Sequence, residues 1–210
     1  MRYQFLVDTY ETERLKVLSV WTMFEEGDLP VRPRGEGPHG RSVHEHMVHQ
    51  CVGEDAWFKN MLGIDVAAAP LPESETKLAF LQQYAEDSGN RLEALSSKPE
   101  SWWEETVPFF EVQRSRAWIL VRRIAHTAHH RGQLTTLLRV LGRPVYSTYG
   151  PTEDTGGLTK NGATVIYPYK DIRELIESEV QGGRKARLPG PGSSPVSERP
   201  RSSSAAKVQQ

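Results

Sequence analysis

Residues 115–141 read SRAWILVRRIAHTAHHRGQLTTLLRVL, and this stretch decides the fold. Its apolar side chains recur every three or four residues, the spacing that places them on one stripe of an α-helix. Gly142, followed by Arg143 and Pro144, is the stop signal expected after the last turn. The stretch therefore predicts the longest helix of the chain, over residues 115–141.

Three further helices are predicted upstream, over residues 5–24, 43–62 and 75–95. The start of the second is the best marked, because Ser42 and Glu45 form the capping-box pattern. Gly63 follows its last turn and marks its end. Four long helices with little strand signal indicate an all-α fold, a four-helix bundle over residues 1–145.

The remaining segments are predicted as loops, one short helix and a tail. Residues 25–41 are rich in proline and glycine, and an irregular connection of this length is usually functional or mobile. We expect it to cover the site. Residues 146–181 are predicted as a post-bundle loop with a short helix over residues 171–180. Residues 182–210 are rich in Gly, Pro, Ser and Arg, which predicts a disordered tail.

Composition excludes several classes of function. No apolar run approaches the roughly 18 residues of a membrane span, and the N-terminal apolar stretch is too short for a signal peptide. Cys51 is the only cysteine, so neither an intrachain disulfide nor a thiolate zinc cluster is possible. We expect a soluble protein of the cytoplasm that does not bind membranes.

Charge argues against nucleic acid as a partner. The formal net charge is -1, but the cations and acids are unevenly distributed. The tail carries Arg184, Lys185, Arg187, Arg199, Arg201 and Lys207 against one acid, Glu198. The body is therefore acidic, which makes binding of a phosphate backbone by the folded domain improbable.

All seven histidines fall in two short segments. They are His39, His44, His46 and His49 around the start of the second helix, and His126, His129 and His130 in the last one. At 100° per residue, His126 and His130 lie about 40° apart in the apolar stripe, whereas His129 lies about 100° from His130. One such pair binds an ion only weakly, so a third ligand must come from another helix. Helical periodicity does not decide whether His46 or His49 is that third ligand.

Two segments carry a family resemblance: SVHEHMVH at residues 42–49 and AHTAHHRGQL at residues 125–134. They resemble the two metal motifs of the DinB/YfiT-like family, and the resemblance covers about residues 1–145. It implies the metal ligands His49, His126 and His130. It also implies a divalent metal ion, with zinc, nickel and iron as candidates, and often a homodimer. Relatives include transferases that use a metal to activate a low-molecular-weight thiol.

The neighbours of this triad have more ordinary interpretations. We expect His46 and His129 to face solvent or a helix neighbour, with a pocket position as the alternative for His46. Glu45 is interpreted as a cap residue rather than a partner of a metal ligand. Two interpretations of Arg123 stay open: it pairs with an acidic substrate near the metal, or it forms a salt bridge to another helix. Gly132 is costly inside a helix, which predicts close approach of a neighbouring segment.

Three functions follow as hypotheses. The first is a metal-dependent enzyme that activates water or a low-molecular-weight thiol for attack on a small electrophilic molecule. The second is a non-catalytic metal-binding protein of a stress response. The third is a helical interaction module with incidental histidines. No glycine-rich phosphate loop or nucleophile elbow is present, so nucleotide binding and acyl-enzyme chemistry have little support.

Overall fold

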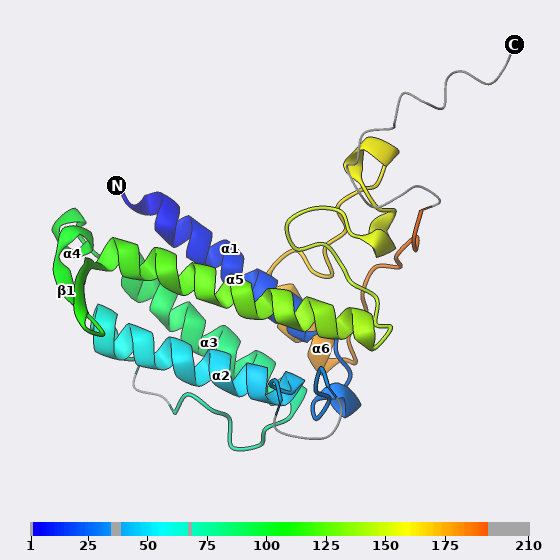
Figure 1. Cartoon of the computed structure of the whole chain (residues 1–210), viewed down its shortest axis with the longest axis horizontal. Coiled ribbons are helices and arrows are strands. Elements are labelled where there is room, and N and C mark those ends of the chain that lie inside the picture. Colours follow the sequence, from blue (N-terminus) through cyan, green and yellow to red (C-terminus); the bar gives the residue numbers. More distant parts are fainter. Residues whose placement is uncertain (1, 35–38, 67–68, 193–210) are drawn as a thin grey trace, which may run out of the picture.

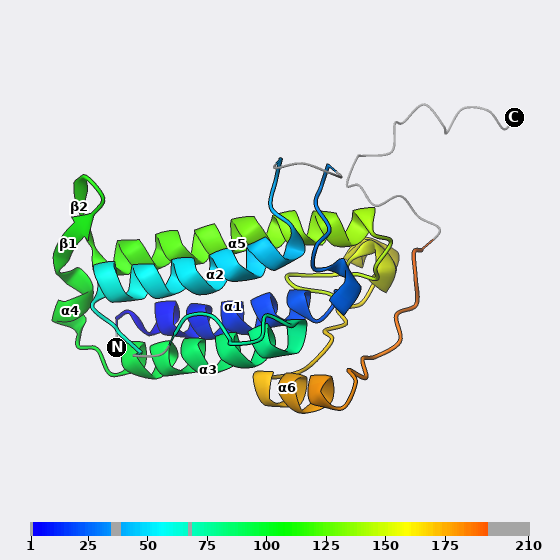
Figure 2. The same cartoon turned by 90° about the horizontal axis from the view of Figure 1, so that it is seen from below.

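The computed structural model describes residues 2–34, 39–66 and 69–192. The four long helices are α1 (Gln4–Trp21), α2 (Val43–Trp57), α3 (Lys77–Ser96) and α5 (Arg116–Val140). A single π-helical segment, η2 (Phe58–Leu62), continues α2 to the predicted end. The predicted four-helix bundle is confirmed. Figures 1 and 2 show two pairs of helices in layers, α2 with α5 and α1 with α3.

The helices begin where polar side chains can cap them. Ser42 and Glu45 form the predicted capping box of α2, with the Ser42 Oγ accepting from the Glu45 amide. At the starts of α3 and α5, the hydroxyls of Thr76 and Ser115 also accept from a backbone amide three residues on. The left-handed Gly142 ends the α5 region as expected (φ 67°). Local sequence chemistry therefore fixes the ends of three of the four helices.

Two short elements connect α3 to α5 and were not predicted. Helix α4 (Glu100–Glu104) is followed by an antiparallel hairpin of β1 (Thr106–Phe109) and β2 (Val112–Ser115). Phe110 stands at the turn with a positive φ of 51°. Strands of four residues are too short for alternation to be recognised against the helical background.

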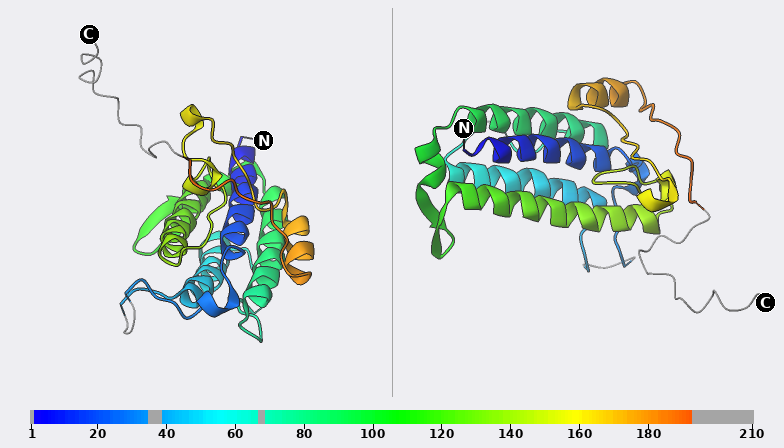
Figure 3. Two further views of the ribbon diagram at one scale, coloured as in Figure 1. Left: turned by 90° about the vertical axis from the view of Figure 1, so that its right-hand side faces the viewer. Right: turned by 90° about the horizontal axis from the view of Figure 1, so that it is seen from above.

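The segment after the bundle folds back along it. It contains the 3₁₀ turns η3 (Glu153–Thr155) and η4 (Thr159–Asn161) and the helix α6 (Ile172–Val180). The predicted short helix is confirmed, and Figure 3 shows it against the outer side of α3. The chain then runs on beside the body, where the Tyr146 hydroxyl donates to the Ala186 carbonyl. Residues 193–210 lie outside the described residues, so the disordered tail stays a prediction.

The core has two apolar clusters with a polar layer between them. One contains Trp21, Met47 and Leu137, and the other contains Phe58 and Trp103. The buried charged and polar side chains between them are Glu13, Arg14, Gln50, Glu54, Asp87, Ser88, Arg91, Arg123 and Arg131. Bundle helices are more often apolar throughout this region, so a polar layer at mid-length requires compensating partners.

Two further findings concern single features. A Cβ atom added to Gly132 would meet nothing within 4 Å, and this residue is exposed. The predicted close approach at Gly132 is therefore wrong, and the structure gives no packing reason for the glycine. Within the described ranges, no helix combines the length and the apolar character needed to cross a bilayer.

Candidate metal centre

Three imidazole rings converge between α2 and α5. The Nε2 atom of His130 lies 3.1 Å from Nε2 of His49 and 3.2 Å from Nε2 of His126. One ring nitrogen from each residue can be chosen so that all three lie within 4.8 Å of one another. Two nitrogens bound tetrahedrally at about 2.0–2.1 Å from one ion would be about 3.3 Å apart. The three histidines implied by the sequence are therefore brought together and could hold a metal ion.

The helix geometry explains the convergence. His126 and His130 are one turn apart on α5, and His49 faces them from α2. Beside them, Gly53 leaves space on α2: a Cβ atom there would lie 3.9 Å from the His49 ring and 3.5 Å from the Arg123 guanidinium. Both distances are ordinary van der Waals contacts, so the His49 ring lies close to α2 at this position, and an alanine would also fit here.

Gln133 orients His130. Its Oε1 atom lies 2.9 Å from Nδ1 of His130, and its Nε2 atom lies 3.3 Å from Nε2 of His129. Because the amide oxygen only accepts, Nδ1 of His130 carries the proton and Nε2 presents its lone pair to the other two rings. His129 is exposed, as expected. Gln133 therefore holds the most buried of the three rings in the tautomer that a metal requires.

His126 is oriented differently. The Arg123 Nη1 atom lies 3.3 Å from Nδ1 of His126, and Trp57 stacks on the ring at a centroid distance of 5.8 Å. A guanidinium only donates, so Nδ1 accepts and the proton of the neutral ring is on Nε2, facing the cluster. Coordination through Nε2 requires that proton to leave or to move to Nδ1, which would break the contact with Arg123.

Burial keeps the rings neutral. Burial and then the positive charge of Arg41 lower the pKa of His49 to about 4. Burial and then Arg123 lower the pKa of His126 to about 4. The pKa of His130 is also lowered, mainly by burial, with the Gln133 hydrogen bond acting in the opposite direction. At neutral pH the three rings are therefore uncharged, the form in which imidazole binds metals, and His126 presents its lone pair at Nε2 once its proton has left that atom.

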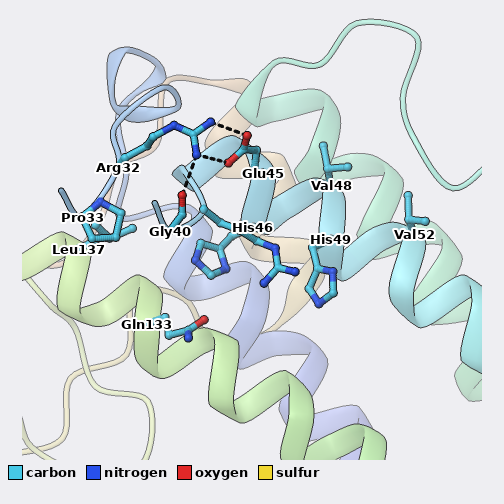
Figure 4. Close-up of a pocket in the computed structure, with 11 residues that line it drawn as sticks. Arg32, Pro33, Gly40, Glu45, His46, Val48, His49, Val52, Gln133 and Leu137 are labelled. Carbon is cyan, nitrogen blue, oxygen red and sulfur yellow. Dashed lines mark hydrogen bonds and ion pairs between the residues drawn. The ribbon is translucent and has the colours of Figure 1, made fainter. Parts of the chain in front are cut away.

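His46 is buried between α2 and α5. Its side chain is only 3% exposed, and its ring centroid lies 5.5 Å from that of His130. It lines a pocket of about 770 Å³ that also reaches His49 and Gln133. Figure 4 shows His46 and His49 pointing from α2 toward Gln133 on α5. Of the expectations for His46, the solvent-facing position is not observed, whereas the contact with a neighbouring helix and the pocket position are, because the turn of α2 after the cap faces α5 rather than water.

Glu45 and Arg123 have structural partners. Glu45 completes the capping box and also accepts from the Arg32 guanidinium at 2.6 Å, so its interpretation as a cap residue is confirmed. Arg123 is 1% exposed and donates to Oε1 of Gln50 at 2.8 Å. Its charge also faces Glu54 at 3.4 Å. Of the two interpretations of Arg123, pairing with another helix is the one observed.

A buried carboxylate next to the cluster was missed. Glu54 accepts from the Tyr10 hydroxyl at 2.7 Å and from the Tyr84 hydroxyl at 3.0 Å. Arg123 and Arg91 lie 3.4 and 3.6 Å from its oxygens. Burial, followed by the Glu54 charge, raises the pKa of both tyrosines well above its usual value, so both hydroxyls remain donors. Its position along the sequence could have revealed it, because Glu54 falls at helical spacing on the buried stripe of α2.

Fold and site together define a four-helix bundle that carries three convergent histidines on two facing helices. The chain belongs to the DinB family, whose profile matches residues 8–159. Among solved structures, a DinB-like protein from Bacillus cereus is similar with a TM-score of 0.60 and 18% identity. That match covers 69% of this chain and 95% of the other, and it supports the fold alone.

A second solved structure, a DinB-like protein (YjoA) from Bacillus subtilis, has a TM-score of 0.49 and 12% identity. The match covers 65% of this chain and 92% of that protein. No curated protein gives a significant match. The comparisons therefore establish the family and the fold, while the chemistry has to be argued from the side chains.

Proposed function

We propose that this DinB family protein binds one divalent metal ion through His49, His126 and His130. We further propose that it is an enzyme that uses the ion to activate water or a low-molecular-weight thiol for transfer to a small electrophile. The observation that carries the proposal is the convergence of three Nε2 atoms, with neighbouring distances of 3.1 and 3.2 Å. Zinc, nickel and iron all accept imidazole ligands, so the native ion is open among them.

The residues present suit such an ion. Three neutral nitrogens leave at least one coordination position for another ligand, the arrangement found in catalytic rather than structural zinc sites. When bound, the ion would lower the pKa of a coordinated water or thiol and so supply a nucleophile near neutral pH. Gln133 would hold the His130 ring in its ligand tautomer. The pocket beside His49 gives a small molecule access.

Elemental analysis of untagged protein tests metal binding. We expect about one zinc, nickel or iron per chain, and loss of most of that metal in His130→Ala and His126→Ala proteins. His129→Ala is the matched control, because His129 is an exposed histidine on the same helix. Retention of the metal by His130→Ala protein, or equal loss in His129→Ala protein, would refute the assignment.

A second experiment separates an enzyme from a metal-binding protein without turnover, the alternative function in a stress response. Metal-loaded protein is incubated with thiols and electrophilic acceptors, and consumption of the acceptor is followed. The enzyme proposal predicts turnover that disappears in His49→Ala and His130→Ala proteins. Stoichiometric metal without turnover across the screen favours the alternative.

Assembly and location are further parts of the proposal. A homodimer is supported by exposed apolar side chains near the hairpin, Phe110 and Trp118, which are 73% and 41% exposed. Sedimentation at several protein concentrations tests it. A cytoplasmic location is supported by the absence of a disulfide, since the only cysteine of the chain, Cys51, is free and buried. Fractionation of the source cells tests the location.

A further inference from the structure

The pocket beside the histidine cluster carries a net positive charge. Its charged lining residues are Arg32, Arg41 and Glu45. Arg32 is neutralised, because Glu45 accepts from both ends of its guanidinium at 2.6 and 2.5 Å. The third charge, Arg41, has no hydrogen bond or ion pair within the described ranges. One cation is therefore available to a ligand in the pocket.

Arg41 lies close to the candidate metal ligands. It lines the same pocket as His46 and His49. A ligand that pairs with Arg41 would therefore also be near the open side of the cluster. The guanidinium presents a planar fork of donors, which matches the two oxygens of a carboxylate.

His46 supplies a second donor. It lines the same pocket and is 97% buried, and its Nδ1 atom is enclosed without a partner among the described residues. A proton on Nδ1 would be an orphaned donor in the interior, so the neutral ring is expected to carry its proton on Nε2. Nε2 is then the atom through which His46 can donate to a bound molecule.

Apolar side chains line the pocket beside these donors and the polar side chains of His49 and Gln133. Val48, Val52 and Leu137 face the pocket, and its volume of about 770 Å³ is that of a site for a small molecule. These side chains suit a short hydrocarbon body between a charged end and a metal-bound end. The pocket offers one unpaired cation, so one arginine and one neutral donor balance the charge of a monoanion and leave the second charge of a phosphate dianion without a partner.

We propose that Arg41 and His46 form a carboxylate subsite, so that the molecule that approaches the metal carries a carboxylate a few bonds from its metal-binding atom. The inference rests on the proposed function, because it assigns the substrate class of that same centre. Arg41 and His46 are specificity residues in this account and do not bind the ion.

The test uses cobalt-loaded full-length protein and two thiols of similar length, 3-mercaptopropionate and neutral 2-mercaptoethanol. Binding is read from the thiolate-to-cobalt absorption band. We expect the carboxylated thiol to bind at least about tenfold more tightly, the factor that one charge-assisted pair provides. Arg41→Gln should bring the two affinities to within about twofold and leave the cobalt spectrum without thiol unchanged. His46→Phe should reduce the preference in part.

Arg34→Gln is the matched control, because Arg34 is an exposed arginine of the same loop that does not line the pocket. It should keep the preference. If wild-type protein binds neither cobalt nor zinc, nickel or iron, both the proposed function and this inference are wrong. If it binds cobalt but Arg41→Gln retains the preference, only the carboxylate subsite is wrong. Displacement of the thiols by inorganic phosphate at lower concentration than by propionate would also overturn the carboxylate assignment.

Discussion

Replacing Glu54 by glutamine removes one negative charge from the centre of the polar layer. The carboxylate is 1% exposed and is shared by two arginines and two tyrosines. Glutamine has nearly the same shape, so the change leaves the packing intact, removes the charge and turns one acceptor oxygen into an amide donor. Arg91 and Arg123 would then be buried cations that have lost their common counter-ion.

The size of the destabilisation depends on which partners each arginine retains. Breaking a buried ion pair by removing one partner costs about 3–5 kcal/mol. Arg91 retains Asp55 at 3.0 Å, and Arg123 retains Oε1 of Gln50 at 2.8 Å. These contacts place the cost at the lower end, about 3 kcal/mol. For a chain of this size, that corresponds to a decrease in Tm of about 6–12 °C.

Urea unfolding of metal-free protein, followed by far-ultraviolet circular dichroism, measures this cost. Glu177→Gln is the control, because that carboxylate pairs with Arg173 on the surface of α6 and its loss should leave the midpoint unchanged. A destabilisation of Glu54→Gln below about 1 kcal/mol would refute the reasoning that the arginines depend on its charge.

Two further predictions concern the centre itself. Gln133→Leu removes the acceptor of the His130 Nδ1 proton, so metal affinity should fall about 10- to 100-fold in competition with a chromophoric chelator; unchanged affinity would contradict the orienting role. In metal-free protein, folding lowers the pKa of His46, His49 and His126 from 6.5 to about 4, so the unfolded chain takes up protons first as the pH falls. The free energy of unfolding should therefore decrease from pH 7 to pH 5, more steeply in wild type than in His49→Ala protein, and equal slopes in urea unfolding would count against neutral buried rings.

Sequence predicted the elements whose signals are local. Ser42 and Glu45 marked the start of α2 because a cap requires only its own turn, and Gly142 marked the end of α5 for the same reason. The spacing of His126 and His130 placed both rings on one side of a helix without knowledge of the partner helix. The hairpin at residues 106–115 was missed because strands of four residues leave too little pattern.

The parts that failed depend on how helices rotate against each other. His46 and His49 lie on adjoining faces of α2, and only the packing of α2 on α5 shows that both rings point inward. Glu54 has its partners on three other elements, so its role could not be recognised within α2 alone. At Gly132 the error was to predict a tertiary contact that is not there. The glycine in a helix was explained by close packing, but its surroundings are open.

The measurement that tests the central claim most directly is X-ray absorption at the edge of the bound metal in untagged protein. Convergence of His49, His126 and His130 predicts three imidazole nitrogens in the first coordination shell, at about 2.0–2.1 Å if the ion is zinc. In His130→Ala protein, we expect that number to fall to two if any metal remains. A shell with no more than one imidazole, or one left unchanged by His130→Ala, would contradict the account.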